Sequence, residues 1–472
     1  MPEVAARQHP TATLTVLVVA GTSYSLLQSL VAPALPVIQH DLHTSESGVS
    51  WVLTAYLLSA SVATPLIGRL GDIFGKERLL VIALGLLAVG TLMAALADSL
   101  TLMLPARVVQ GAAGGIFPLS FGIIRDEFPR EKVAGAIGLL SALLGVGGGL
   151  GVALAGPITD SLSFHYLFWL PLIAIVLATI ATHLFVPESP VKAPATINWL
   201  GAFLMALGLG SILLAVTQAP SWGWGSARTL GLIGAGSVVL AAWVVDETRA
   251  KQPLVDMRMM RIRGVWTANA AALLLGFGMY ASFFLLPQLV ETPERAGFGF
   301  GASVTGAGLF MIPQTVGVLL AGTQAGRLEA RFGSKPPLVA GGAVACASYL
   351  VLALAHDARW EVFVASSLLG LGVGLAFAAM ANLVIESVEP EETGVAAGMN
   401  TVMRSVGGAF GGAVTASIIS ATVGRRLFPT EQGYTAAFLV CAGVVVVGIV
   451  AAALAPPKQV RRLAGRPLHE PT

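Results

Sequence analysis

Fourteen apolar stretches, each about as long as one membrane crossing, account for most of this 472-residue sequence. A helix needs roughly 20 apolar residues to cross the hydrocarbon core of a bilayer. The stretches lie at residues 12–37, 49–69, 79–97, 101–124, 133–157, 165–186, 196–217, 228–245, 264–290, 302–325, 337–355, 360–385, 393–421 and 434–455. Charged residues make up only 11% of the sequence, against about 25% in soluble domains. We therefore predict an all-α membrane protein with 14 transmembrane helices.

Basic residues in the connections predict which side of the membrane the chain ends face. With an even number of crossings, both termini lie on the same side. Of the 27 Lys and Arg residues, 20 fall on that side, five fall on the other side, and Arg107 and Arg404 lie within spans. Positively charged connections stay in the cytoplasm. We expect a multi-pass protein of the cell membrane with both termini cytoplasmic and no nucleic-acid partner.

A short polar stretch, Gly68 to Leu80, lies between the second and third apolar runs. We expect a tightly turned connection there, because glycine permits a close reversal of the chain. Its glycine and leucine spacing recurs downstream at Gly326, Leu328 and Gly333, and the offset from Gly68 to Gly326 is 258 residues. A stretch repeated at that distance indicates two similar halves, as in many transporters.

The repeat divides the chain into two halves around a central segment. We expect residues 1–190 to form a six-helix bundle and residues 191–250 to add two central helices. Residues 251–472 would form a linker and a second six-helix bundle, pseudo-symmetric with the first. The connection from Asp246 to Gly264 is either an interfacial helix or a basic linker. Cys346 and Cys441 lie inside apolar runs, so we expect no disulfide and no metal site.

Three further stretches carry a family resemblance. The fourth run holds an arginine three residues before Gln-Gly, the fifth run is glycine-rich, and the thirteenth holds a Gly-Met-Asn sequence followed by an arginine. In order, these are Arg107, Gln110 and Gly111; Gly145 to Gly151 with Gly156 and Pro157; and Gly398, Asn400 and Arg404. Together with Gly68 to Leu80, they resemble the motifs of the major facilitator superfamily, in particular its fourteen-span drug:proton antiporter branch. The resemblance covers nearly the whole chain.

Two positions depart from the pattern of that branch. Its members often carry an aspartate in the first span, a little before the Leu-Pro pair that ends it, and the corresponding position here is Leu27. Gly151 is followed by Val152 where a proline is usual. The first departure leaves the proton carrier open, and the second weakens the expectation of export.

Charged residues inside membrane spans are functional candidates, because a charge in hydrocarbon costs several kcal/mol. Arg107 is the first candidate, and the resemblance implies a role in proton coupling. The alternative is that it binds backbone carbonyls and only holds its span in place. Arg404 is open to either a substrate contact or a structural contact, and we expect it one to two turns after the cytoplasmic start of its helix.

Proton coupling also needs a group that titrates, yet no acidic residue lies at mid-depth in a predicted span. The nearest candidates, at the outer ends of spans, are Asp41, Asp160, Glu291 and His165, with His40 and His43 nearby. The alternative for each is a solvated loop residue. The missing acid argues against a strongly cationic substrate, which requires a buried counter-charge.

The glycine-rich stretch between the second and third spans is also a candidate conformational gate. Asp72 can meet the positive N-terminal end of the helix at 393–421 across the two halves, and Arg78 and Asp126 can extend the pairing. The alternative is a solvated turn. The expected gate residues are Gly68, Asp72, Gly75, Lys76, Arg78 and Asp126.

Helical spacing predicts which side chains line a substrate site. In the run at 264–290, Asn269, Tyr280 and Phe284 belong to one helical face, with Gln288 one turn on. Polar groups on such an aromatic surface suit a large amphipathic ligand, although interhelical hydrogen bonds explain each residue equally well. The expected substrate-binding residues are Tyr24, Gln28, Tyr56, Gln110, Asn269, Tyr280, Phe284, Gln288, Gln314, Asn400 and Arg404.

These observations lead to one main function and two alternatives. The main hypothesis is proton-coupled export of amphipathic drug-like or antibiotic molecules by alternating access. A lipid or lipophile translocator with weak or no proton coupling also suits the missing acid, and proton-coupled uptake uses the same fold. We find no nucleophile with its base, no metal-ligand cluster and no phosphate loop, so we do not expect an enzyme or a cofactor. The expected partners of the monomer are a small amphipathic substrate, protons and the bilayer.

Overall fold

The computed structural model describes residues 10–189, 196–423 and 428–457, and these residues form helices with no strands. Fourteen helical segments are long and apolar enough to cross a membrane. The predicted number of transmembrane helices is therefore confirmed.

The helices follow one another with short connections. The first half contains α1 (Pro10–Leu30), α2 (Leu35–Asp41), α3 (Glu46–Phe74), α4 (Lys76–Ala95), α5 (Leu100–Gly111), α6 (Ile116–Glu127), α7 (Arg130–Ser161) and α8 (Tyr166–Phe185). A central pair follows, α9 (Trp199–Trp222) and α10 (Ala227–Arg249). The second half contains α11 (Met257–Met260), α12 (Arg263–Glu291), η1 (Glu294–Ala296), α13 (Val304–Phe332), α14 (Lys335–Leu354), α15 (Arg359–Ser387), η2 (Pro390–Glu392), α16 (Thr393–Ala421) and α17 (Glu431–Ala453).

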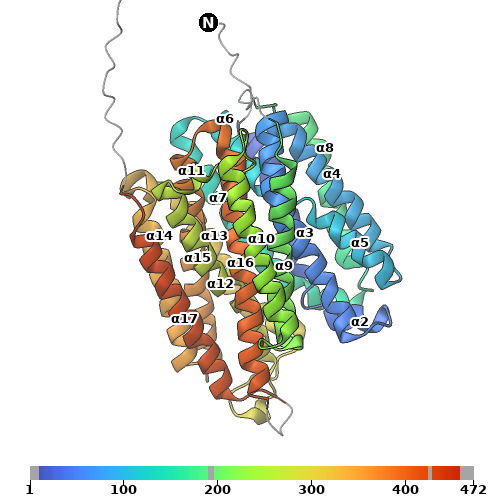
Figure 1. The fold of residues 1–472 in the computed structure, drawn as a ribbon. Helices are drawn as coiled ribbons and strands as arrows, with labels where there is room; N and C mark the ends of the chain where they lie inside the picture. Colours follow the sequence, from blue (N-terminus) through green and yellow to red (C-terminus); the bar gives the residue numbers. More distant parts are fainter. Residues whose placement is uncertain (1–9, 190–195, 424–427, 458–472) are drawn as a thin grey trace, which may run out of the picture.

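The long helices run side by side in one bundle (Figure 1). We call the end at which α1 begins and α17 ends the terminal face, and the other end the opposite face. In Figure 1 the terminal face is at the top. The connections at the terminal face include Gly75 and the segment before α16, whereas the first residue of α17 lies at the opposite face.

Helices α3 and α13 have the same length and the same kinds of residue at their ends, as expected if the two halves are repeats of each other. Each has 29 residues and begins after a serine, Ser45 or Ser303, whose side chain accepts a hydrogen bond from a backbone N–H in the first turn. Such a serine satisfies one of the free N–H groups at a helix start. Each helix ends at a glycine with positive φ, Gly75 at 113° and Gly333 at 80°, where other residues are strained. The 258-residue offset therefore holds at both ends of the helix.

Two pairs of helices make most of the interface between the halves: α7 packs against α13, and α3 packs against α16, while α15 and α6 add smaller contacts to α7 and α16. Glycines let the backbones approach closely. A Cβ atom at Gly138 would lie 2.9 Å from the carbonyl oxygen of Gly322, and one at Gly326 would lie within 2.4 Å of Gly135. The glycine-rich fifth span is thus a contact surface between the halves.

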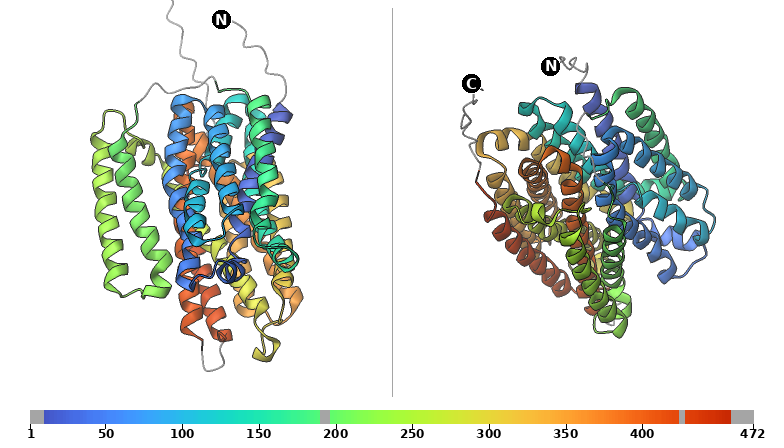
Figure 2. Two further views of the ribbon diagram at one scale, coloured as in Figure 1. Left: turned by 90° about the vertical axis from the view of Figure 1, so that its right-hand side faces the viewer. Right: turned by 45° about the horizontal axis from the view of Figure 1, so that its top comes forward.

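The central pair, α9 and α10, packs at the edge of this interface. Helix α9 contacts α10, α3 and α16, and Figure 2 shows the pair standing at one side of the bundle. The indole nitrogen of Trp224 donates a hydrogen bond to Ser417 Oγ on α16 over 2.8 Å. The central pair therefore contacts both halves.

Several helix boundaries differ from the predicted ones. The first predicted span is broken at residues 31–34, before Pro36 at the start of α2, and the fourth is broken at residues 112–115. In the second break, a Cβ at Gly115 would collide with Ile67, so close contact with α3 accounts for the glycines. Between the end of α10 at Arg249 and the start of α12 at Arg263 the connection holds the single turn α11, which favours the basic linker over the interfacial helix.

The prediction that Gly68 to Leu80 forms a polar connection between helices was wrong, because most of this stretch is helical. Helix α3 continues to Phe74 and α4 begins at Lys76, so Gly75 alone forms the turn. The helices can continue through this charged stretch because its central charges pair with one another, as described below.

Candidate functional site

A small cavity lies between the two halves. Residues of α1, α3, α7, α12 and α16, together with Gly114 and Phe117, line it. About 20 Å³ is open to the centres of water molecules, which is room for about one or two waters. Its lining consists of Tyr24, Gln28, Leu57, Ala60, Ser61, Thr64, Gly114, Phe117, Leu144, Tyr280, Thr401, Arg404 and Ser405. The lining is thus a mixture of aromatic, aliphatic and hydroxyl or amide groups.

Arg404 is the one charged side chain among these lining residues. It is buried, and its guanidinium carbon lies 4.9 Å from the ring centroid of Phe377. Its Nε atom has no hydrogen-bond partner among the described residues. Arg404 lies eleven residues after the start of α16 at Thr393, or about three turns. Our expectation of one to two turns was therefore wrong, and the arginine lies at mid-depth.

Arg107 lies in a second polar cluster, inside the first half. Its Nε donates to the carbonyl oxygen of Val52 over 3.0 Å, and its Nη1 donates to Gln110 over 2.6 Å. The amide of Gln110 donates in turn to Thr91 Oγ1 over 3.1 Å. The guanidinium carbon lies 4.6 Å from the ring centroid of Tyr56. This fully buried cluster joins α3, α4 and α5.

Two tyrosines connect the Arg107 cluster to the cavity. The ring centroids of Tyr56 and Tyr24 are 6.4 Å apart, and Tyr24 lines the cavity. The Nη2 atom of Arg107 has no hydrogen-bond partner among the residues that the structure describes. A change at Arg107 can therefore reach the cavity through two aromatic contacts.

Asp72 joins the two halves at the terminal face. Its Oδ1 accepts a hydrogen bond from the N–H of Gly394 and its Oδ2 accepts one from the N–H of Val395, each over 3.1 Å. These N–H groups belong to the first turn of α16, where they have no partner within the helix and the helix dipole is positive. The expected meeting of Asp72 with this helix end is present.

Backbone contact between α3 and α16 brings the carboxylate this close. A Cβ at Gly68 would lie 2.4 Å from the carbonyl oxygen of Gly394. A Cβ at Gly394 would lie 2.8 Å from Asp72 Oδ1. Any larger side chain at either position would separate the helices and break the contact.

Lys76 supports Asp72 from within the first half. Its Nζ lies 2.7 Å from Asp126 Oδ2 and 3.7 Å from Asp72 Oδ1, and all three side chains are buried. Ser189 Oγ donates to Asp126 Oδ2 over 2.5 Å. Arg78, which was expected to extend the pairing, is instead exposed. Lys76 occupies the position between the two carboxylates because it follows the turn at Gly75 directly, on the inner side of α4.

The family model described as "Major Facilitator Superfamily" matches this chain twice, over residues 17–412 and over residues 268–471. Together the two matches span nearly the whole chain, and they include both halves of the fold described above. The chain belongs to the major facilitator superfamily. It is a multi-pass membrane transporter and not an enzyme.

Several similar proteins are named for drug transport or for resistance to drugs and antibiotics. The tetracenomycin C resistance and export protein of Streptomyces glaucescens is 27% identical over 434 residues, covering 90% of this chain and 78% of that protein. The multidrug transporter protein MdtP of Bacillus subtilis is 27% identical, covering 88% and 76%. The multidrug resistance protein Stp of Mycobacterium tuberculosis is 28% identical, covering 85% and 74%.

A solved superfamily structure shares the fold. The human organic anion transporter MFSD10 (TETRAN) aligns with a TM-score of 0.68 and 16% sequence identity. The alignment covers 94% of this chain and all of that one. The likeness in fold therefore extends over both halves of the bundle.

The structure brings only some of the predicted substrate residues of this transporter to the cavity. Tyr24, Gln28, Tyr280 and Arg404 line it. Tyr56 and Gln110 lie in the Arg107 cluster instead. Phe284 and Gln288 are partly buried further along α12 and are not among the lining residues.

The polar stripe predicted on α12 is mostly a packing surface against α16. Asn400 Nδ2 donates to Asn269 Oδ1 over 3.0 Å, and a Cβ at Gly276 would lie 2.5 Å from the carbonyl oxygen of Arg404. Gln314 Nε2 donates to Ser282 Oγ over 3.2 Å, linking α13 to α12. Interhelical hydrogen bonds therefore account for three of the predicted substrate residues, Asn269, Gln314 and Asn400.

The predicted proton-coupling acids all lie near the opposite face. Asp41 is exposed and pairs with His40 over 3.0 Å. Asp160 accepts a hydrogen bond from Thr305 over 3.1 Å. Glu291 is exposed at the end of α12, and His165 lies 3.4 Å from Asp98. None of these residues lines the cavity, and their roles stay predictions.

Two polar residues that our sequence analysis did not single out are placed between helices. Arg125 donates from Nη2 to the carbonyl oxygen of Val388 over 2.7 Å and from Nη1 to Thr393 Oγ1 over 2.5 Å, so it also joins the halves at the terminal face. Glu329 is buried, and its Oε1 has no hydrogen-bond partner among the described residues. It was missed because α13 extends to Phe332, beyond the predicted end of its span.

Proposed function

We propose that this transporter exports amphipathic small molecules from the cell in exchange for protons, by alternating access between its two halves. The names of the related proteins, with tetracenomycin C resistance and export among them, support the direction and the substrate class. The preference for basic residues on the side of the termini supports a cytoplasmic terminal face in the cell membrane. Residues 1–190 and 251–472 act as the two moving bodies, with residues 191–250 beside them.

The contact of Asp72 with α16 carries the proposal of alternating access. The cluster of Asp72, Lys76 and Asp126 has two acidic groups and one basic group, so it carries one excess negative charge when all are ionised. The positive N-terminal end of α16 offsets that charge only while the halves touch at the terminal face. A contact of this kind closes the cytoplasmic side and breaks when the halves tilt apart.

The cavity between the halves is the proposed substrate site. Arg404 is its one charged lining residue, and no carboxylate is among the described residues that line it. A buried positive charge beside Tyr24 and Tyr280 favours neutral or anionic amphipathic molecules over cations. The cavity is small because the halves are in contact, and it must widen when they separate.

Proton coupling requires a carboxyl or imidazole group that reaches water in one conformation and not in another. Glu329 meets this requirement best, since it is buried near the terminal face on α13, one of the interface helices. Ser334 Oγ donates a hydrogen bond to its Oε2 over 3.5 Å. We assign Arg107 a supporting role, because its cluster contacts the cavity through Tyr56.

Transport into everted membrane vesicles tests the proposal. With tetracenomycin C outside and an acidic vesicle interior, the wild-type protein should accumulate the compound, and collapsing the pH gradient should stop accumulation. Vesicles without the protein provide the background. Accumulation that ignores the pH gradient would favour a lipid or lipophile translocator, and proton-driven movement in the reverse direction would favour uptake.

A variant at Glu329 separates coupling from transport in the same assay. Glu329→Gln keeps the size and polarity of the side chain and removes its proton-binding group. It should still equilibrate the compound down its own gradient, but no longer respond to pH. Glu294→Gln, at an exposed position on the opposite face, is the matched control. A Glu329→Gln protein that remains fully pH-driven would exclude Glu329 as the proton carrier.

A further inference from the structure

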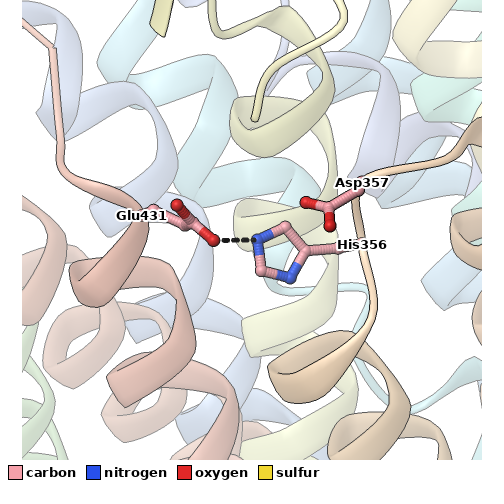
Figure 3. A group of neighbouring side chains, drawn as sticks. All are labelled: His356, Asp357 and Glu431. Atoms are coloured by element: carbon pink, nitrogen blue, oxygen red, sulfur yellow. Dashed lines mark ion pairs between the residues drawn. The ribbon is translucent and has the colours of Figure 1, made fainter. Parts of the chain in front are cut away.

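Three potential metal ligands meet at the opposite face of the second half. His356 and Asp357 lie in the connection between α14 and α15, and Glu431 is the first residue of α17. Their ligand atoms all lie within 4.8 Å of one another. Figure 3 shows both carboxylates approaching the same imidazole ring. The cluster is separate from the cavity, the Arg107 cluster and the Asp72 contact.

A hydrogen bond to the backbone fixes the orientation of the His356 imidazole. Its Nδ1 lies 2.8 Å from the carbonyl oxygen of Leu352, and a carbonyl oxygen only accepts hydrogen bonds, so the proton of a neutral ring is on Nδ1. The Nε2 atom then presents its lone pair towards Glu431. His356 is only 3% exposed, and Nε2 has no hydrogen-bond partner among the described residues.

The spacing of the cluster suits an ion better than a hydrogen bond. Nε2 of His356 and Oε1 of Glu431 are 3.8 Å apart, which is too long for a hydrogen bond. Two ligands on one tetrahedral zinc ion, with bonds of about 2.0–2.2 Å, lie about 3.4 Å apart. Small side-chain shifts would therefore place an ion between them. The Glu431 side chain is 56% exposed, so it can move and an ion can enter from water.

We propose that His356, Asp357 and Glu431 bind a divalent transition-metal ion such as Zn²⁺. An imidazole with two carboxylates favours transition metals over Ca²⁺ or Mg²⁺, which prefer oxygen ligands alone. Metal-binding histidines usually donate a hydrogen bond from their other ring nitrogen, and His356 Nδ1 makes such a bond to the carbonyl oxygen of Leu352. The ion ties the connection after α14 to the start of α17, and water completes its coordination. This site differs from our expectation that the chain has no metal-ligand cluster, because Glu431 is far from His356 and Asp357 in the sequence.

Metal binding by the intact protein tests this proposal. The full-length transporter is purified in detergent with a histidine-free affinity tag, stripped with a chelator and titrated with Co²⁺ and Zn²⁺. We expect one Co²⁺ ion per chain, with a visible absorption band that Zn²⁺ displaces, and a rise in the unfolding temperature on adding Zn²⁺. Glu431→Gln and Asp357→Asn change exposed side chains, so these variants should fold and bind at least tenfold more weakly.

His183→Gln is the control variant. His183 is exposed and lies 3.7 Å from Glu77, but it belongs to no three-residue group of this kind in the described part of the chain. Its metal affinity should equal that of the wild type. No binding by the wild-type protein at millimolar metal, or equal binding by the wild type and Glu431→Gln, would overturn the proposal.

Discussion

Lys76 and Asp126 form an ion pair that is closed off from solvent, with 2.7 Å between Nζ and Oδ2. The lysine follows the turn between α3 and α4, and the aspartate is the last residue but one of α6. The same ammonium group lies 3.7 Å from Asp72 Oδ1. The ion pair therefore fixes the one carboxylate whose hydrogen bonds reach the second half.

Removing the ammonium group should destabilise the protein. Lys76→Met leaves Asp72 and Asp126 buried without their cation, and breaking a buried pair in this way costs about 3 kcal/mol or more. We expect a clearly lower unfolding temperature in detergent. The double variant Lys76→Met with Asp126→Asn should recover part of the loss. Arg78→Met, at an exposed position two residues away, is the control, and equal unfolding temperatures for Lys76→Met and Arg78→Met would contradict the prediction.

Weakening the contact of Asp72 with α16 should open the terminal face. Asp72→Asn removes the negative charge that is attracted to the start of α16, which should weaken the contact by about 1 to 2 kcal/mol. The population of molecules with an open terminal face should therefore rise roughly five- to thirtyfold. The reporter is a cysteine at Ser405 in the cavity, with the buried Cys346 and Cys441 replaced by alanine. Its maleimide labelling in everted vesicles should become faster. Glu131→Gln, at an exposed position at the start of α7, is the control, and an unchanged labelling rate in Asp72→Asn would count against the gate.

Arg107 should be needed for transport and not for membrane insertion. Arg107→Ala removes the donors to Val52 and Gln110 and the contact with Tyr56. We expect at least a tenfold loss of proton-driven uptake into everted vesicles. Arg107→Lys should fail as well, because lysine lacks the planar fork of donors. Expression and monodispersity check the fold, and Arg359→Ala, at an exposed position, is the control. Uptake by Arg107→Ala at the wild-type rate would show that transport does not need Arg107.

Arg404 should affect substrate affinity more than the maximal rate. Arg404→Gln removes the one charge among the described lining residues of the cavity, so KM for an anionic amphipathic substrate should rise at least tenfold. The KM for a neutral substrate should change less. Arg258→Gln, at the exposed terminal face, should leave both KM values unchanged. Equal KM values for Arg404→Gln and Arg258→Gln would exclude a substrate contact.

The membrane spans could be predicted from the sequence because hydrocarbon selects apolar residues in every crossing. The contact between Asp72 and α16 could also be predicted, since an acid at one helix end and a helix start opposite it attract each other. The breaks at residues 31–34 and 112–115 could not, because they depend on how closely neighbouring helices pack. Arg125 was missed because its partners are distant in the sequence, and Glu329 was missed because it lies past the predicted end of its span.

The substrate residues show a different limit of sequence reasoning. Asn269 and Asn400 lie on helical faces that suit a ligand, yet they bond to each other across α12 and α16. A polar side chain in a span is satisfied either by a ligand or by a neighbouring helix, and helical spacing is the same in both cases. Only the packing of the two helices decided between them.

Distances between spin labels on the two halves test the central claim most directly. One pair of cysteines replaces the exposed Arg78 and Glu391 at the terminal face, and a second pair replaces the exposed Asp98 and Glu294 at the opposite face. The account predicts two populations for each pair, and Asp72→Asn should lengthen the first distance while it shortens the second. A single distribution at both faces, unchanged by Asp72→Asn, pH or substrate, would contradict it.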